Sequence, residues 1–268
     1  MTVFTDHSPE ALAGAIEAHT TELFCALTGA LEGGWVEHDQ DALRFGCAVA
    51  FPLFNGVLRT DLDESDADRR IAELVARQRE AGKPWWWWTW PGSSPADLPA
   101  RLEARGMRAV ATTPGMWIDL DAVSDPGRPD GLEIVPVDTP ERVAGWIRVI
   151  GPSFGLPSDA LRAFARLAER SAFGDVPARN WLGVVGKRPV AAGSVGYAAG
   201  VAGIFNVATA QDVRRRGHGT AVTAHALRCA REAGYRTGVL TASELGIGSY
   251  RRLGFEEVTS VTSYAPDG

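Results

Sequence analysis

The feature that most limits the possible folds is a set of landmarks that occurs twice, in the same order, along this 268-residue chain. The pairs are Phe54-Asn55 with Phe205-Asn206, Arg79–Gly82 with Arg231–Gly234, and Gly106-Met107 with Gly254-Phe255. Their offsets of 151, 152 and 148 residues are almost constant. This spacing predicts a duplicated unit of strand, turn, helix, strand, short helix and strand.

Local patterns within each half agree with that order. In the first half, Ser65 begins an S-x-x-D pattern that is typical of a helix start. Ile71, Leu74, Val75 and the polar Gln78 follow at helical spacing. In the second half, the pattern predicts strands at Ile204–Thr209 and Val239–Thr241 with a helix at Thr220–Ala233 between them. Each half is therefore expected to contain a sheet and helices that pack against it.

The boundary between the halves is predicted in the segment DAVSDPGRPDG, from Asp121 to Gly131. Pro and Gly interrupt regular structure there, and polar residues fill the rest. We expect a first domain at residues 1–121, a linker at 122–131 and a second domain at 132–268. The chain length is compatible with two domains of ordinary size.

The run Trp85–Trp90 contains five tryptophans and is predicted to be a strand. Four of them are consecutive, which invites a ligand cage or a platform for stacking bases. Because alternate side chains of a strand face opposite sides of a sheet, we favour core packing instead.

Composition excludes several classes of protein. The net charge of -6 disfavours nucleic acid as a partner, because a phosphate backbone requires a basic face. Three cysteines, an odd number without C-x-x-C spacing, indicate reduced thiols in the cytoplasm rather than a disulfide framework. The five histidines form no H-E-x-x-H pattern, so we expect no metal. No apolar stretch is long enough to span a membrane, and the first residues do not resemble a signal peptide.

The most informative motif is the turn from Arg214 to Thr220, R-R-R-G-H-G-T, between a predicted strand and a predicted helix. A helix N-terminus presents free N–H groups and a partial positive charge, and glycines let the backbone wrap around a phosphate. The turn is not a Walker A loop, because no Gly-Lys-Ser/Thr follows. It also departs from the Rossmann fingerprint, whose third glycine is replaced by Val222. Taken alone, R-R-R-G is more typical of a solvated basic turn, so the choice between that interpretation and a pyrophosphate site depends on the residues that flank it.

The turn resembles the acetyl-CoA motif of the GNAT (Gcn5-related N-acetyltransferase) superfamily, [QR]-x-x-G-x-[GA], with Arg214, Gly217 and Gly219 in the matching positions. The flanks, Val207-Ala208-Thr209 before it and Ser249–Phe255 after it, also fit the family. The similarity extends by order of elements from Leu132 to Tyr264 and is sharpest from Ile204 to Phe255. It implies an α/β (α+β) fold of two GNAT-like domains, each a mixed, mostly antiparallel sheet flanked by helices.

The resemblance also implies a mechanism, in which acetyl passes directly from acetyl-CoA to an amine. The family's strand before the turn separates from its neighbour at a bulge and holds the pantetheine arm. The residues placed at the cofactor are Val207, Ala208, Thr209, Arg214, Arg215, Arg216, Gly217, His218, Gly219, Thr220 and Ser243. Tyr250, four residues before Gly254, matches the tyrosine that protonates the departing thiolate. Asn206 is a candidate for orienting a water or the amine, but it cannot act as a base.

The general base stays unassigned from sequence. The strand Ile204–Thr209 contains no carboxylate, and Glu244 after the next strand is a weaker candidate. The first half lacks the turn altogether, since Thr60–Asp66 is acidic and has no G-x-G, and Leu102 stands where Tyr250 would be. That half is therefore expected to be degenerate and to bind no CoA.

Three functions remain open at this point. The first is an N-acetyltransferase for the primary amine of a small molecule, as a monomer or homodimer. The second is a CoA-binding regulatory module without turnover, which the missing base leaves possible. The third, a Rossmann nucleotide-binding protein, is disfavoured by Val222.

Overall fold

The computed structural model describes residues 2–267, which divide into two compact units. Unit 1 contains residues 2–23 and 115–258, and unit 2 contains residues 24–114 and 259–267. Each unit is a mixed sheet with helices, so the predicted fold class is confirmed. In the described part of the chain, no helix is both long enough and apolar enough to cross a membrane.

The sheet of unit 1 has the strand order β6-β7-β8-β9-β10-β5. All neighbouring strands are antiparallel except β9 and β10, which are parallel. The strands are β5 (Met107–Asp119, of which residues 115–119 belong to this unit), β6 (Leu132–Pro136), β7 (Ala178–Val185), β8 (Arg188–Ala198), β9 (Val201–Thr209) and β10 (Thr237–Thr241). The strands predicted at Ile204–Thr209 and Val239–Thr241 are thus confirmed as parts of β9 and β10.

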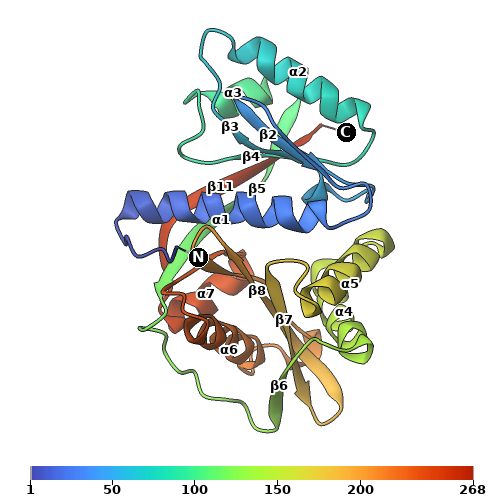
Figure 1. The fold of residues 1–268 in the computed structure, drawn as a ribbon, viewed down its shortest axis with the longest axis vertical. Coiled ribbons are helices and arrows are strands. Elements are labelled where there is room, and N and C mark those ends of the chain that lie inside the picture. The colour runs from blue at the N-terminus through green and yellow to red at the C-terminus, as the bar shows by residue number, and fades with distance from the viewer. Residues whose placement is uncertain (1, 268) are drawn as a thin grey trace. The chain divides into compact units, whose positions relative to one another are not determined.

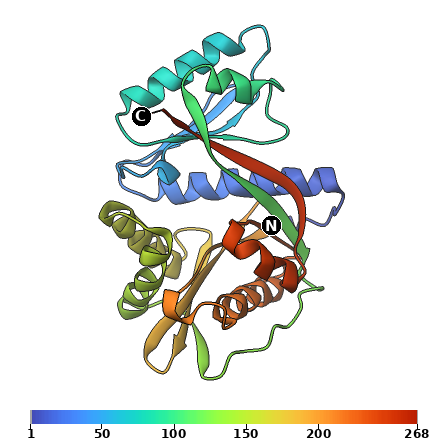
Figure 2. The ribbon, with the colours of Figure 1, turned by 180° about the vertical axis from the view of Figure 1, so that it is seen from behind.

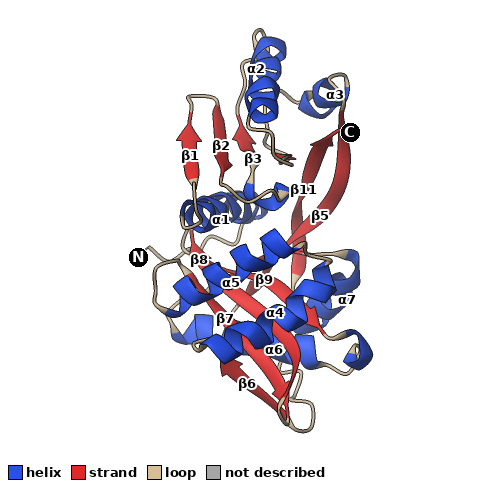
Figure 3. Cartoon of the chain, turned by 90° about the vertical axis from the view of Figure 1, so that its right-hand side faces the viewer, coloured by secondary structure: helices blue, strands red, loops and turns tan. Residues whose placement is uncertain are grey.

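Helices cover both faces of this sheet (Figure 1). They are α4 (Pro140–Phe154), α5 (Ser158–Ala172), α6 (His218–Glu232) and α7 (Glu244–Leu253). Helices α4 and α5 lie across β7–β9 in Figure 3, and α6 and α7 pack on the opposite face. Neighbouring residues of β7 show the alternation, because Leu182 contacts α4 beside Gly145 while Gly183 contacts Val222 of α6.

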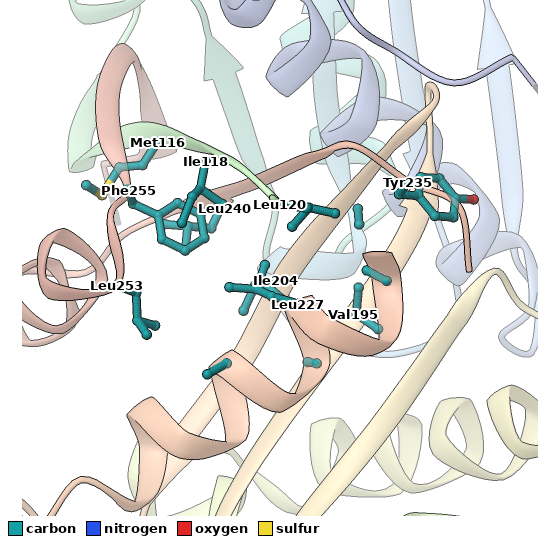
Figure 4. Close-up of a cluster of buried hydrophobic side chains, with 14 of the residues drawn as sticks. Met116, Ile118, Leu120, Val195, Ile204, Leu227, Tyr235, Leu240, Leu253 and Phe255 are labelled. Carbon is teal, nitrogen blue, oxygen red and sulfur yellow. The ribbon is translucent and has the colours of Figure 1, made fainter. Parts of the chain in front are cut away.

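Helix α6 packs on the sheet through small residues. Ala224, Ala226 and Ala230 are buried with Leu227 in a core that also contains Ile204 and Phe255. Figure 4 shows Leu227 of α6 beside Ile204 and Val195 of the sheet. A Cβ added at Gly193 of β8 would lie 2.8 Å from Val222 Cγ1, so the helix approaches the strand at a glycine. This close seating fixes the position of the N-terminus of α6.

Unit 2 has the strand order β1-β2-β3-β4-β11-β5. The elements are β1 (Trp35–His38), β2 (Ala42–Gly46), the 3₁₀ turn η1 (Pro52–Phe54), β3 (Gly56–Thr60), α2 (Ala67–Glu80), β4 (Trp86–Thr89), α3 (Leu98–Glu103) and the end of β11 (Glu256–Pro266). Helix α1 (Pro9–Gly29) contributes residues 9–23 to unit 1 and the remainder to unit 2.

The order of elements repeats as the sequence predicts. The order β1-β2-β3-α2-β4-α3-β5 corresponds to β7-β8-β9-α6-β10-α7-β11, and in both sheets the third and fourth of these strands are parallel. Two landmark pairs mark equivalent places, since Gly82 and Gly234 follow the long helices and Gly106 and Gly254 precede the last strands, all with positive φ. The third pair does not correspond. Phe54 ends η1 before β3, whereas Phe205 lies within β9.

The last strand of each repeat pairs with the sheet of the other repeat. Residues 115–119 of β5 pair with β10 in unit 1, while residues 262–264 of β11 pair with β4 in unit 2. The compact units therefore differ from the linear division at residues 121–131, because pairing groups the terminal segments by hydrogen bonds rather than by order in the chain. No pattern along the sequence predicts that β5 pairs with β10 and that β11 pairs with β4.

The tryptophan run packs in the interior of unit 2, as the sequence favours. Trp87 lies in a core with Ile71 and Leu74 of α2, whereas Trp88 contacts Phe45 at a ring-centroid distance of 5.7 Å. Alternate tryptophans thus face opposite sides of β4. The predicted cap at Ser65 is wrong, because α2 begins at Ala67 and Ser65 Oγ donates instead to Asp63 Oδ1 at 2.5 Å.

Candidate active site

Strand β9 carries a β-bulge at Asn206 and Val207. Ala192 pairs with Ala208, but Ser194 pairs with Phe205, so two residues of β9 stand opposite one residue of β8. Asn206 has a φ of 54°, a left-handed conformation that asparagine adopts more readily than most residues. The bulge that the family resemblance implies is therefore present. It interrupts the regular alternation of side chains along β9, and residues 205–207 are all half-exposed.

Strands β9 and β10 separate after Gly203, before the bulge. Within residues 2–267 they pair only at Gly238 with Ala202 and at Val239 with Gly203. Strand β10 continues to pair with β5 as far as Thr241, so only its β9 side is released. Val207 and Ser243 each lie four residues past the last pair, and they mark the two sides of the opening. The backbone of β9 there is available to a ligand.

The predicted phosphate turn connects β9 to α6. After the short 3₁₀ turn η2 (Gln211–Val213), Arg214 is extended, Arg215 has a φ of 62°, and Gly217 caps α6 with a φ of 82°. Helix α6 begins at His218, two residues earlier than predicted, which places His218, Gly219 and Thr220 in its first turn. Their N–H groups have no intrahelical acceptor and point out of the helix with its positive dipole end. This arrangement forms an anion-binding concavity.

Gly219 lets the first turn of α6 approach the end of β9. A Cβ at this position would lie 2.8 Å from Thr209 Oγ1, closer than side chains tolerate. Arg214 Nε also donates to the Thr209 carbonyl at 3.2 Å. Gly219, the second glycine of the motif, therefore allows the strand and the helix to pack closely. Thr209 contacts the turn in two ways, because its hydroxyl lies against Gly219 and its carbonyl accepts a hydrogen bond from Arg214.

The charges around the turn favour an anion. The side chains of Arg215 and Arg216 are exposed, and among the described residues neither forms an ion pair. The nearby carboxylate of Asp212 is paired with Arg188, which offsets its negative charge and lowers its pKa through a hydrogen bond. His218 is only 7% exposed, and its Nδ1 is buried without a hydrogen-bond partner. A ring nitrogen without a partner, together with the free N–H groups and two arginines at a helix N-terminus, suits a phosphate group, so these residues fit the pyrophosphate of CoA.

Tyr250 lies on α7 and packs against the core of unit 1. Its ring meets Phe255 edge-on at a centroid distance of 5.8 Å, and Gly246 leaves room for it, since a Cβ there would lie 2.8 Å from Tyr250 Cε2. The hydroxyl makes no hydrogen bond to any residue that the structure describes. Burial raises the pKa of Tyr250 to about 12, so the phenol holds its proton at neutral pH.

Two other residues considered from the sequence, Ser243 and Glu244, lie at the start of α7. Ser243 caps α7 at the end of β10, and its carbonyl accepts the N–H groups of Gly246 and Ile247. Glu244, the carboxylate that directly follows Ser243 in the sequence, is exposed in the first turn of α7. Pro129 was not expected near the turn, yet its Cγ would be 3.4 Å from a Cβ at Gly217. Because Pro129 and Gly217 are far apart along the chain, no local sequence pattern predicts that they are neighbours.

Comparison with known proteins agrees with this geometry. Residues 190–258 match the family described as an acetyltransferase (GNAT) domain, a segment that contains the bulge, the phosphate turn and Tyr250. Within residues 190–258, the chain is therefore similar in sequence to a GNAT acetyltransferase domain. No protein with a curated functional description matches this sequence.

Solved structures show the GNAT fold over nearly the whole chain. A GCN5-related N-acetyltransferase from Kribbella flavida superposes with a TM-score of 0.71 at 18% identity, over 93% of this chain and 96% of that one. A tandem GNAT protein from the clavulanic acid biosynthesis pathway gives 0.61 at 16% identity, over 99% and 98%. A glucosamine N-acetyltransferase region of a fungal multi-domain β-N-acetylglucosaminidase gives 0.64 at 12% identity, over 97% and 37%.

Proposed function

We propose that this protein is an N-acetyltransferase that transfers acetyl from acetyl-CoA to the primary amine of a small molecule. The observation that carries the proposal is one continuous arrangement in unit 1. The bulged end of β9 leads through the phosphate turn into α6, and Tyr250 on α7 follows the strand on the other side of the opening.

Each predicted residue has a role in this proposal. The N–H groups at His218, Gly219 and Thr220 bind the pyrophosphate, with Arg215 and Arg216 adding charge. The released backbone of Val207 to Thr209 holds the pantetheine arm and polarises the acetyl carbonyl. Preorganised donors aimed at a developing oxyanion supply much of the catalysis in such reactions.

Tyr250 donates a hydrogen bond to the departing sulfur. The amine nitrogen forms a bond to the carbonyl carbon, the carbon–sulfur bond breaks, and the amine releases one proton to solvent. Because the pKa of Tyr250 is raised to about 12, complete transfer to a thiolate, whose thiol has a pKa of about 8.5, is uphill. Tyr250 therefore stabilises the sulfur mainly as a protonated donor, and solvent restores its proton after any transfer.

The small amine is the acceptor class that we favour. One structural neighbour is described as a glucosamine N-acetyltransferase region, and glucosamine is a small primary amine. Asn206 is half-exposed at the bulge, and we assign it the role of orienting that amine or a water. We further propose a cytoplasmic protein that acts as a monomer or homodimer, in keeping with its three cysteines, which form no disulfide within the described residues.

Unit 2 is proposed to bind no CoA. Where unit 1 has the arginine turn, the segment from Thr60 to Asp66 carries four carboxylates, which would repel a pyrophosphate. Leu102, which takes the place of Tyr250 before Gly106, is fully buried and has no proton to donate.

The test is release of free CoA thiol from acetyl-CoA with a panel of small amines. Tyr250→Phe should lower kcat by about 10²-fold or more, with little change in acetyl-CoA affinity, because a lost proton donor affects the transition state. Tyr235→Phe is the matched control, since it removes a buried tyrosine hydroxyl from the same core and should leave kcat unchanged.

The outcomes separate the candidate functions. Turnover by the wild type that falls in Tyr250→Phe alone supports the enzyme. Tight acetyl-CoA binding without turnover on any amine would favour a CoA-binding regulatory module, the alternative that the lack of a carboxylate on β9 keeps open. Absence of acetyl-CoA binding would refute the proposal as a whole.

A further inference from the structure

A cavity of about 460 Å³ lies in unit 1 beneath the segment that joins β5 to β6. In Figures 1 and 2 this segment runs past α6 before it enters β6. Residues 123–128 form one wall, and the outer side of α6 from Ala221 to Arg231 forms the other. We call this the linker cavity. No role described above uses it.

Three arginines line the linker cavity, and two of them lack a counter-ion among the described residues. Arg128 and Arg228 form no ion pair with any described residue, and Arg231 Nη1 lies 4.0 Å from Asp121 Oδ1. The acid in the lining, Asp125, is already engaged, because its Oδ1 accepts the Gly127 N–H at 3.0 Å. Two exposed guanidiniums facing one hollow repel each other unless an anion lies between them.

His225 adds a polar group to the same wall. Its Nδ1 is buried without a hydrogen-bond partner, and its Nε2 lies 3.6 Å from Cys229 Sγ. Burial is the main cause that lowers the pKa of His225, and the charges of Arg228 and Arg128 lower that pKa further. The charges of both arginines therefore reach this imidazole, which is neutral at pH 7 and can still donate one N–H.

The linker cavity begins next to the phosphate turn. Pro129, one residue after Arg128, would lie 3.4 Å from a Cβ at Gly217, and Ala221 in the cavity wall is one helical turn after that cap. His225 lies a further turn along α6, about 10 Å from the start of the helix at 1.5 Å per residue. A second phosphate group attached to a ligand at the turn is thus within reach.

We propose that the linker cavity binds a phosphate monoester through Arg128 and Arg228. Arginine forks match phosphate oxygens, and a dianion between the two guanidiniums replaces their repulsion by attraction. Two sources supply this chemistry: the 3′-phosphate of CoA held at the turn, which rests on the proposed function, or a separate phosphorylated small molecule.

The test is calorimetric titration of the full chain with CoA, dephospho-CoA and inorganic phosphate at fixed ionic strength. The variant is Arg128→Gln/Arg228→Gln, and its matched control is Arg77→Gln/Arg79→Gln on α2, which removes equal charge far from the turn in sequence. If the 3′-phosphate binds here, the wild type and control should prefer CoA over dephospho-CoA by about tenfold or more. The variant should lose this preference while its affinity for dephospho-CoA is unchanged.

If a separate phosphorylated molecule is the ligand, inorganic phosphate should bind the wild type and the control but not the variant, whether or not CoA is present. If variant and control bind all three probes alike, the linker cavity is not a phosphate site. Binding of dephospho-CoA by the variant shows that the pyrophosphate site is intact, so failure of this inference is distinguishable from failure of the proposed function.

Discussion

Replacing Gly219 with alanine tests the packing on which the phosphate turn depends. The new Cβ would lie 2.8 Å from Thr209 Oγ1, well inside the 3.5–4.0 Å of a relaxed contact. Because Thr209 is β-branched and sits in a strand, its hydroxyl has few alternative rotamers. We expect the first turn of α6 to move away from β9, at a cost of about 1–3 kcal/mol.

That movement displaces the N–H groups that bind the pyrophosphate. If the whole cost falls on binding, the affinity for acetyl-CoA should decrease by about 5- to 150-fold. Titration with acetyl-CoA measures this change, and urea unfolding measures any share that falls on stability. Gly14→Ala is the control, because it lies in helix α1 with no atom within 4 Å and should leave binding unchanged.

A second substitution identifies the cause. Thr209→Ala removes the hydroxyl that the new methyl group meets, so Gly219→Ala should cost much less in that background than in the wild type. A double-mutant cycle should then show a coupling of about 1 kcal/mol or more. Unchanged acetyl-CoA affinity and stability in Gly219→Ala, or equal losses in both backgrounds, would refute the reasoning.

Two further predictions concern His19, whose Nε2 lies 3.1 Å from the Gly196 carbonyl in the interior of unit 1. Burial lowers the pKa of His19 from 6.5 to about 4, so the unfolded chain binds a proton that the folded chain refuses. Stability should fall as the pH decreases from about 6.5 to 4, by about 3 kcal/mol in total, and urea unfolding at several pH values should show this loss reduced in His19→Asn. Gly203→Ala would place a Cβ 2.0 Å from His19 Cε1 and should cost about 3 kcal/mol or more in unfolding free energy, part of which His19→Ala should restore.

The sequence was sufficient for the parts of the site that depend on neighbours along the chain. The turn that begins at Arg214 lies between a strand and a helix as the pattern predicts, although α6 begins two residues earlier than expected, and Tyr250 lies on a helix after the next strand. Helix starts, glycine caps and alternating strands are set by hydrogen bonds and side chains a few residues apart. Such features remain legible in a single sequence.

The tertiary structure alone decided the features that depend on distant segments. The family resemblance implies a bulge in the strand before the turn, but its position at Asn206 and Val207 depends on the register between β8 and β9, which no local pattern specifies. The structure also separates Phe54-Asn55 from Phe205-Asn206, although the two dipeptides are identical in sequence. Phe54-Asn55 lies before β3, whereas Phe205-Asn206 lies within β9.

The exchange of β5 and β11 and the passage of the linker along α6 are of the same kind. Each depends on which of several compatible strands or surfaces a segment meets once the chain is compact. A strand's own residues fix its alternation but not its neighbour, because the backbone hydrogen bonds that join strands are the same for every sequence. The sequence therefore determined the elements and the chemistry of the turn, and packing between remote parts of the chain determined how those elements form a site.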